Sequence, residues 1–541
     1  MTGNSIVTRL GPDVWYLVLQ HVPDRNDLSN LCRVCKELNT FATQFLYRTI
    51  TIGPPLVDNY TTYFRKMMRL TGEKPEYKLH STKWGESLAL VLRLATHLNG
   101  NSQVQAHAVR EIDIMAMRSQ ERRKEPDNLG PEFEEELPGL VRVLPNLRHV
   151  RMSSSTPTFE ELFRALHEHP NKPEIHLLKE NGSRLVSGAI PGVVTIKAQV
   201  SPWEDTPEKP NTVVPDIEKL LFACPNLKSF SLSVRNNYGG CMSPRLHHPV
   251  TKTFQFASSN AVTFPPLEFL SLSGYDMSDE EWPHWRDGLD WSRLKILHLG
   301  PDPVRSRGPA MADLLGRFEG HATALRTLTV ETWAAEGKET CPPLLSFLES
   351  FDTLEELTVN GHFIPVQNLA RHRKLRRLCL HCIEVQRPEG SCRPTYGVAD
   401  LTLLDEICPG LETLEIDISR NASGEWSKEV IGPLASSFSH LRDLTIHCEA
   451  GLVFDYARQD EPVLPLLDEG LVRAFAEVFF ASRGSSRMEK LTIKTGEGLR
   501  RFPQWHPRYR RVEEKCTREF NAWLQKSDGE VKVEGCKVFL F

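Results

Sequence analysis

The stretch CPGLETLEI, from Cys408 to Ile416, decides the fold because its second half recurs along most of the chain in slightly altered form. In that half, Leu411, Leu414 and Ile416 follow an L-x-x-L-x-L spacing. Side chains alternate across a strand, so Leu414 and Ile416 point to one side and the residues beside them to the other. We therefore predict a short strand with one buried face and one solvated face.

Copies of this spacing run through the chain. They begin at Leu147, Leu227, Leu267, Leu294, Leu325, Leu354, Leu375, Leu411, Leu441 and Met488. A further copy is expected at Val109, and the long interval after Leu147 predicts a degenerate copy near Val193–Ala198. Several intervals match the period of about 20–29 residues that is typical of leucine-rich repeats. One such unit cannot bury its apolar face alone, whereas stacked units share a core, so the copies predict one solenoid.

Helix-like runs separate several of the copies. These runs are Asp216–Ala223, Met311–Phe318, Leu344–Ser350, Leu401–Cys408 and Leu471–Ala481. Alternating strands and helices favour an α/β horseshoe over a plain β-solenoid. Most copies lack the usual asparagine after the third apolar position, so the pattern does not fix the curvature. Insertions rich in Pro, Gly and polar residues are expected to form surface loops at Pro170–Pro215, Asn236–Pro266, Ile383–Asp400 and Ala450–Glu469.

The composition is that of an ordinary globular protein. The chain has 541 residues, of which 40% are hydrophobic and 25% charged. Its net charge of -5 is too balanced to predict a nucleic acid or a membrane surface as partner. The sequence starts without a signal-peptide pattern and has no apolar stretch of about 18 residues, so we expect a cytoplasmic or nuclear protein with free thiols.

The residues before the repeats have a different period. In LGPDVWYLVLQHVPDRNDLSNLCRVCKELNTFATQFLYRTI, Leu10–Ile50, Pro12 suits the first position of a helix that Pro23 ends. Asp27 is expected to cap a second helical stretch, in which apolar residues recur every three to four positions. We predict three short helices with a small core, and a strand within Leu46–Ile52 that joins them to the repeats.

This segment resembles an F-box, whose pattern begins L-P-x-E-I-L, continues through an apolar helix to D-L, and then reads apolar-V-(S/C)-K. The matching positions are Leu10, Pro12, Asp13, Val14, Leu17, Leu19, Val22, Asp27, Leu28, Leu31, Val34, Cys35 and Lys36. Gly11 replaces the usual proline, Asp13 replaces glutamate, and Leu38 stands where the family often has tryptophan. With the repeats behind it, the chain is similar to F-box/leucine-rich-repeat proteins of the fungal type.

The resemblance implies a function. In that family, the F-box docks on a Skp-type adaptor of a cullin-RING ubiquitin ligase, and the repeats hold the protein to be ubiquitinated. The adaptor-binding residues that it implies are Leu10, Pro12, Leu28, Leu31, Val34 and Cys35. Two alternatives stay open. The helices could serve only as a cap for the solenoid, since terminal repeats need a polar-faced lid, and the repeats could act as an interaction scaffold without a ligase.

The predicted architecture is α/β, with an N-terminal three-helix F-box followed by an irregular leucine-rich-repeat solenoid. The expected parts are the F-box at 5–50, a linker and capping helix at 51–108, the solenoid at 109–500 and a C-terminal cap at 501–541.

The sequence gives little support for catalytic or metal chemistry. It contains no P-loop, G-x-S-x-G or H-E-x-x-H motif, so we expect a non-catalytic protein and assign no catalytic residue. The pairs Cys379/Cys382 and Cys32/Cys35 each lack a second C-x-x-C at ligand spacing. We therefore predict no metal ligand and no cofactor.

On each strand, the residues that alternate with buried ones are expected to face the concave side of a horseshoe, its default binding surface. The candidate substrate-binding residues at such positions are Phe269, Ile296, Arg377, Glu415, Asp417 and Asp443. Phe269 and Ile296 belong to consecutive copies, so we expect them about 5 Å apart as an apolar anchor. Alternatively, the insertion Asn236–Pro266 folds over this pair.

Overall fold

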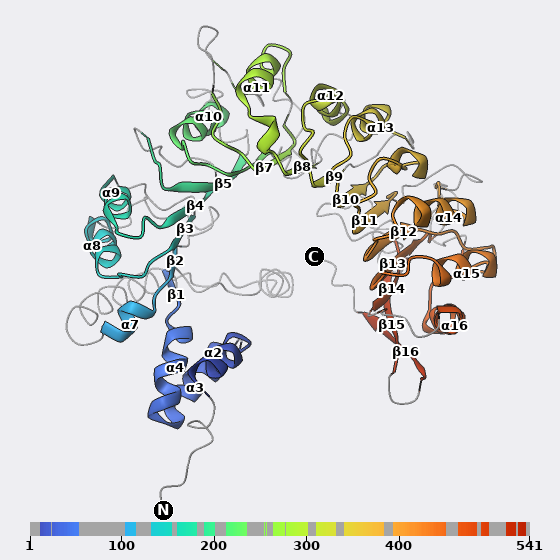
Figure 1. Cartoon of the computed structure of the whole chain (residues 1–541), viewed down its shortest axis with the longest axis horizontal. Helices are drawn as coiled ribbons and strands as arrows, with labels where there is room; N and C mark the ends of the chain where they lie inside the picture. The colour runs from blue at the N-terminus through green and yellow to red at the C-terminus, as the bar shows by residue number, and fades with distance from the viewer. Residues whose placement is uncertain are drawn as a thin grey trace, which may run out of the picture. The chain divides into compact units, whose positions relative to one another are not determined.

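The computed structural model describes residues 11–22, 24–52, 103–114, 131–153, 160–180, 189–200, 213–234, 254, 256, 263–275, 277–300, 310–331, 340–383, 393–450, 464–483, 488, 490–496, 516–525 and 529–536. Leu10 and most of the expected linker at 51–108 lie outside these residues. The chain divides into two compact units. Unit 1 contains Met1–Leu232 and Thr263–Leu267, and unit 2 contains Ser233–Val262 and Glu268–Phe541. In both units, strands alternate with helices along the chain (Figure 1).

Unit 1 begins with three short helices, as the sequence predicts. They are α2 (Pro12–Gln20), α3 (Arg25–Val34) and α4 (Lys36–Leu46). Their core is small and consists of the buried side chains of Leu19, Leu28 and Ala42. Partly buried residues surround this core, namely Val22, Leu31, Cys32, Phe41, Phe45 and Leu46. We call these three helices the helical module.

The first and second helices of the module begin at recognisable residues. Pro12 occupies the first position of α2, where its missing N–H costs nothing. Asp24, whose backbone is extended, caps α3 because its Oδ1 accepts a hydrogen bond from the N–H of Asn26 at 2.8 Å. The predicted cap at Asp27 is wrong, since the helix begins two residues before it and Asp27 lies in the first turn.

A strand-and-helix array follows the module in unit 1. Its elements are β1 (Thr49–Ile52), α7 (Gln103–Ala108), β2 (Glu111–Ile114), α8 (Pro131–Arg142), β3 (His149–Ser153), α9 (Glu160–Glu168), β4 (Glu174–Glu180), β5 (Val193–Val200), α10 (Val213–Ala223) and the start of β6 (Ser229–Val234). Strands β1 to β5 pair in parallel and in chain order. The predicted strand within Leu46–Ile52 is confirmed as β1, and the degenerate copy is confirmed as β5. The repeat pattern misses β4 because Lys172 stands where its leading leucine would be.

Unit 2 continues the same alternation. Its elements are β7 (Phe269–Ser273), α11 (Trp282–Gly288), η3 (Trp291–Arg293), β8 (Ile296–Gly300), α12 (Ala310–Phe318), β9 (Thr327–Glu331), α13 (Pro342–Glu349), β10 (Glu356–Asn360), η4 (Val366–Leu369), β11 (Arg377–His381), α14 (Val398–Ile407), β12 (Thr413–Asp417), α15 (Lys428–Ser436), β13 (Asp443–Cys448), α16 (Glu469–Arg483), β14 (Lys490–Thr495), β15 (Arg518–Leu524) and β16 (Val531–Cys536).

Strands β7 to β14 pair in parallel and in chain order, and an antiparallel hairpin, β15–β16, closes the row. Helices α12 to α16 lie along one face of these strands (Figure 1). The helix-like runs of the sequence are confirmed as α10, α12, α13, α14 and α16. Within the described residues, no helix combines the length and apolar character that a membrane crossing requires.

The repeated apolar positions form the core, as predicted. Leu357 stands beside Leu378, and Leu378 beside Leu414, in the parallel pairing of β10, β11 and β12. All three side chains are buried. Register is strongly fixed by this arrangement, because a slip of one residue would turn the apolar set of a strand toward solvent.

Side chains in the turns before the strands hydrogen bond to the preceding repeat. The amide of Asn146 donates to the carbonyl of His107 at 2.7 Å, and the amide of Asn226 donates to that of Pro191 at 2.9 Å. These exposed hydrogen bonds link each turn to the preceding repeat.

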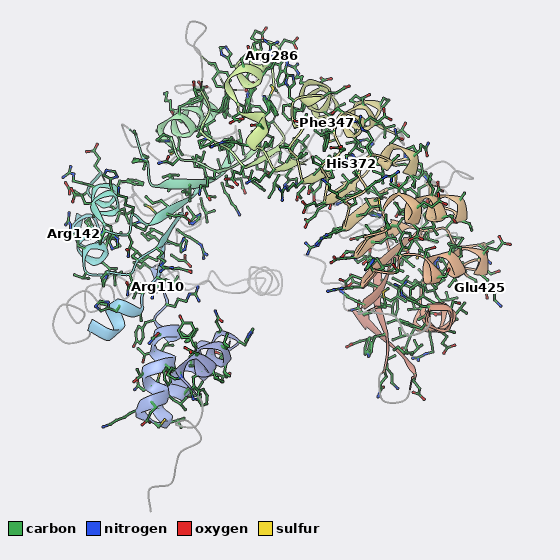
Figure 2. The ribbon with its side chains drawn as sticks, viewed as in Figure 1. Arg110, Arg142, Arg286, Phe347, His372 and Glu425 are labelled. Carbon is green, nitrogen blue, oxygen red and sulfur yellow. The ribbon has the colours of Figure 1, made fainter. Side chains whose placement is uncertain are left out.

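The same arrangement occurs in unit 2. His372 Nε2 donates to the carbonyl of Leu348 at 2.9 Å, next to the fully buried Phe347 of α13 (Figure 2). Burial lowers the pKa of His372, although its hydrogen bond to Leu348 opposes this shift. A neutral imidazole with a proton on Nε2 therefore joins two consecutive repeats.

Truncation of an inward leucine tests this register. We expect Leu357→Ala or Leu414→Ala to lower the free energy of unfolding by about 2–5 kcal/mol, because each leaves a cavity between two strands and a helix. Urea denaturation followed by circular dichroism measures the change. The control is Glu356→Ala, beside Leu357 on the opposite strand face, for which we expect less than about 0.5 kcal/mol. Equal midpoints for all three variants and the wild type would contradict the register.

Candidate functional site

The strands of unit 2 place residues of successive copies in rows on the face opposite the buried leucines, here called the polar face. The first row is Phe269, Ile296, Thr327, Glu356, Arg377, Thr413, Asp443 and Lys490. The second row is Ser271, His298, Thr329, Thr358, Cys379, Glu415, Thr445 and Thr492. The polar face therefore begins with two apolar residues, Phe269 and Ile296, and carries charged residues at its other end, on strands β10 to β14.

The apolar end consists of Phe269 and Ile296. The prediction that they are neighbours is confirmed, since their Cα atoms are partners in the pairing of β7 with β8. Ile296 is 36% exposed and Phe269 is half-buried. Most of the insertion Asn236–Pro266 lies outside the described residues, but its Phe254 stacks on Trp285 of α11 with ring centroids 5.9 Å apart. This part of the insertion packs toward the helices.

The candidate residues at the charged end divide by burial. Arg377 is largely exposed and pairs with Glu356 at 3.3 Å, and Asp443 is half-buried on β13. Both are accessible to a partner, as is the partly exposed Glu415. Asp417 is only 1% exposed, so its prediction as a substrate contact is wrong.

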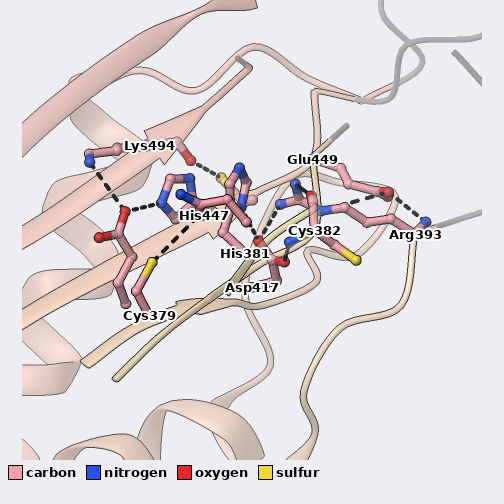
Figure 3. A network of polar contacts seen from close by, with 11 residues as sticks. Cys379, His381, Cys382, Arg393, Asp417, His447, Glu449 and Lys494 are labelled. Atoms are coloured by element: carbon pink, nitrogen blue, oxygen red, sulfur yellow. Dashed lines mark hydrogen bonds and ion pairs between the residues drawn. The ribbon is translucent and has the colours of Figure 1, made fainter. Parts of the chain in front are cut away.

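Asp417 is buried because three donors surround its carboxylate. His381 Nδ1 lies 2.8 Å from Oδ1, and the backbone N–H of Cys382 donates to Oδ2 at 2.5 Å. The guanidinium of Arg393 approaches Oδ1 to 3.1 Å and is 2% exposed (Figure 3). A buried carboxylate with these partners is held in one geometry, and its role is to organise the ends of β11 and β12.

Arg393 reaches Asp417 from the connection between β11 and α14. Its Nη1 donates to the carbonyl of Cys382 at 2.8 Å, and its backbone N–H donates to Glu449 at 2.6 Å. The sequence predicts only a surface loop at Ile383–Asp400. The described end of that connection instead places the Arg393 guanidinium beneath the polar face. No spacing in the sequence predicts this contact.

A second set of contacts lies on the adjoining strands. His447 Nε2 donates to Glu415 Oε1 at 2.5 Å, and the Lys494 ammonium lies 3.4 Å from the same oxygen. Burial alone would raise the pKa of Glu415, but these neighbours lower it to about 2. The rings of His447 and His381 stack with centroids 3.9 Å apart and join the two sets of contacts (Figure 3).

The protonation states in this network are those of a structural site. Burial lowers the pKa of His447, despite its hydrogen bond to Glu415. Burial and the nearby Glu415 carboxylate raise the pKa of the Cys379 thiol. A reactive cysteine needs a lowered pKa, so Cys379 is unsuited to act as a nucleophile at neutral pH.

In the helical module, the candidate adaptor residues occupy different environments. Pro12 is exposed at the start of α2, and Val34 is 67% exposed at the end of α3. Leu31 is half-buried against the core, and Cys35 caps α4 by accepting a backbone hydrogen bond at 3.5 Å. Leu28 is 5% exposed, so it supports the helices from inside and its prediction as a direct contact does not fit.

Three apolar side chains of α2 are exposed along one side of the helix. Val14, Leu17 and Val18 follow the three-to-four-residue spacing that places them together, and Leu17 is 60% exposed. We call them the α2 stripe. The predicted contact set omits these residues, although Val14 and Leu17 match the F-box pattern. Exposed apolar groups at helical spacing are typical of protein-binding sites.

No protein-family model matches the chain, and no curated protein matches it. Three solved structures are similar to parts of it. TLR13 in the TLR13–ssRNA13 complex is 16% identical, with a TM-score of 0.33, and 67% of this chain covers 46% of that chain. The leucine-rich-repeat-containing protein LegL7 of Legionella pneumophila is 13% identical, with a TM-score of 0.24 and coverage of 71% and 94%. A chain in the yeast Rad7 and Elc1 complex is 10% identical, with a TM-score of 0.32 and coverage of 71% and 89%.

This chain spans less than half of the TLR13 chain. Its class follows from its own geometry, since parallel strands alternate with helices and bury leucines at a repeating spacing. It is an α/β protein built of repeated strand-and-helix units.

The buried ion pair gives a stability prediction. We expect Asp417→Ala to lower the free energy of unfolding of unit 2 by about 3–5 kcal/mol, because it leaves the Arg393 cation buried without its carboxylate. Arg377→Ala, which removes an exposed ion pair, should cost less than about 1 kcal/mol. Urea denaturation compares the two variants.

A double variant distinguishes the loss of the ion pair from the loss of packing as the cause of lower stability. Asp417→Leu together with Arg393→Met removes both charges, so it should cost less than the sum of the single substitutions. Additive costs, or equal costs for Asp417→Ala and Arg377→Ala, would contradict the proposed role of the pair.

Proposed function

We propose that this chain is the substrate-recognition subunit of a Skp-cullin-F-box ubiquitin ligase. The helical module docks on the Skp-type adaptor, and the polar face of the repeats binds the protein to be ubiquitinated. The chain itself is non-catalytic and acts in the cytoplasm or nucleus. The observation that carries this proposal is the exposed α2 stripe on a module whose sequence resembles an F-box.

The energetics of the module support an adaptor. Three helices of 9, 10 and 11 residues enclose a core of few side chains, so the module has little apolar burial of its own. Leu17 and Val34 are nevertheless more than half exposed. Removal of such side chains from water contributes about 25 cal/mol per Å² of apolar area, which favours association with a partner helix or groove.

The connection between module and repeats supports the same function. Only Tyr47 and Arg48 separate α4 from β1, and the backbone N–H of Arg110 at the next strand donates to the carbonyl of Arg48 at 2.8 Å. A short, hydrogen-bonded connection holds the first strands at a fixed orientation to the module. A ligase subunit benefits from this rigidity because its substrate must be held at a defined position.

A repeat scaffold that acts without a ligase is the second candidate. The apolar pair Phe269/Ile296 and the charged end of the polar face form a binding surface that does not involve the module. Adaptor binding separates the two functions, since a scaffold has no need of it.

We expect the wild-type chain to form a complex with a Skp-type adaptor when the two are co-expressed and separated by size-exclusion chromatography. Val14→Asp with Leu17→Asp places two charges in the contact, and burial of an unpaired charge costs several kcal/mol, so affinity should fall about 100-fold or more. Expression without the adaptor should give poorly soluble protein.

Thr40→Asp is the matched control, because it adds a charge at an exposed position of α4, outside the α2 stripe. It should retain the adaptor. Leu28→Asp is unsuitable as a test, since that side chain belongs to the core of the module. A wild-type chain that stays soluble and elutes apart from the adaptor would exclude the ligase function and leave the scaffold.

The polar face gives a second test. We expect Phe269→Asp with Ile296→Asp to abolish co-purification of the bound protein, because apolar anchor residues tend to dominate the affinity of an interface. Thr402→Asp, at an exposed position of α14 outside the polar face, is the control. Partners retained in full by the folded double variant would remove the apolar pair from the binding surface.

A further inference from the structure

Three potential metal ligands meet on the polar side of strands β3 and β4 in unit 1. His149 and Glu174 are Cα partners in the parallel pairing, and His176 follows Glu174 by two residues on the same strand face. The buried Ile175 between them confirms that both side chains point away from the core. One ligand atom from each residue lies within 4.8 Å of the other two.

The geometry fits a small transition-metal ion. Zinc binds histidine nitrogen and carboxylate oxygen at about 2.0–2.2 Å, so two ligand atoms of a tetrahedral site are roughly 3.3–3.6 Å apart. His149 Nδ1 and Glu174 Oε2 are already 3.5 Å apart. The rings of His149 and His176 have centroids 5.9 Å apart, and the ligand atoms of all three residues lie within 4.8 Å of one another.

Charged side chains of both signs lie near the cluster. Glu111 and Asp113 on β2 face Arg151 of β3, which lies 3.9 Å from the former and 3.4 Å from the latter. Glu111 also lies 3.9 Å from Arg48, so carboxylates and guanidinium groups both stand near the cluster.

The site is accessible from solvent. His149 lines a cavity of about 730 Å³ between the helical module and strands β1 to β3, together with Arg48, Arg110 and Arg148. The side chains of His149 and Glu174 are both partly exposed. An ion can therefore enter without unfolding of the array, and a fourth position is left for water or for a side chain of a bound protein.

We propose that His149, Glu174 and His176 form a zinc-binding site with an open fourth position. This proposal does not depend on the ligase function. It replaces the prediction of no metal ligand, which rests on the spacing of the cysteine pairs. The ligands are 25 and 2 residues apart in the chain, so only the pairing of β3 with β4 brings them together.

Isothermal titration of the intact chain with zinc chloride at pH 7.5 tests the site. We expect the wild type to bind one zinc more tightly than His149→Ala or His176→Ala by about tenfold or more, because each variant loses a ligand. His167→Ala is the matched control, since that histidine is exposed on α9 and outside the cluster. It should bind zinc like the wild type.

Cobalt supplies an independent readout, because tetrahedral cobalt absorbs visible light far more strongly than the hydrated ion. We expect this absorption in the wild type and in His167→Ala, and its loss in His176→Ala. Circular dichroism should show the same secondary structure for all variants. Zinc affinity that is equal in the wild type and both ligand variants, or no zinc binding at about 100 μM, would overturn the proposal.

Discussion

The fold depends on one hydrogen-bonded ladder between successive copies of a short strand. At the residue before many of the strands, a backbone N–H donates to the carbonyl of the equivalent residue in the previous copy. Arg148 donates to Arg110, and Arg376 donates to Glu355, in both cases at 2.8 Å. This bond places each pair of inward leucines beside the next pair. Burial of the apolar layer follows from the ladder, because a strand without its neighbour would leave that layer in water.

The same alternation that buries leucines also produces the polar face. Residues between the inward positions point to the opposite side of each strand, so the rows of the polar face are built up strand by strand. Its charged end is fixed from below by the Asp417–Arg393 pair and its neighbours. The surface residues that a partner would contact, such as Arg377 and Glu415, therefore stand on a rigid support.

Periodicity predicts much of this fold and little of its polar chemistry. The L-x-x-L-x-L spacing locates the core strands, since side chains alternate along a strand and Leu357 and Leu414 both point inward as this alternation predicts. It fails at β4, where Lys172 replaces the leading leucine and pairing with β3 and β5 defines the strand. The neighbourhood of Phe269 and Ile296 is predictable because they hold equivalent positions in adjacent copies.

Contacts between residues that do not occupy equivalent repeat positions cannot be predicted from periodicity. Arg393 reaches Asp417 from a connection, and His149 meets His176 only through strand pairing. The sequence pattern also fails to predict which apolar residues of the helical module are buried. Leu28 and Val34 both match the F-box pattern, but Leu28 lies in the core and Val34 in solvent. The packing of the three short helices determines this difference.

The hairpin β15–β16 has a consequence for the behaviour of the protein at high concentration. A parallel row that ended at β14 would expose a full edge of backbone groups, and such an edge templates edge-to-edge aggregation. The hairpin pairs that edge and reverses the chain direction. Its outer strand carries Lys532 and Glu534, and charged side chains on an edge strand oppose the approach of a second copy. The length of the array is thereby limited, and polymerisation from this end is disfavoured.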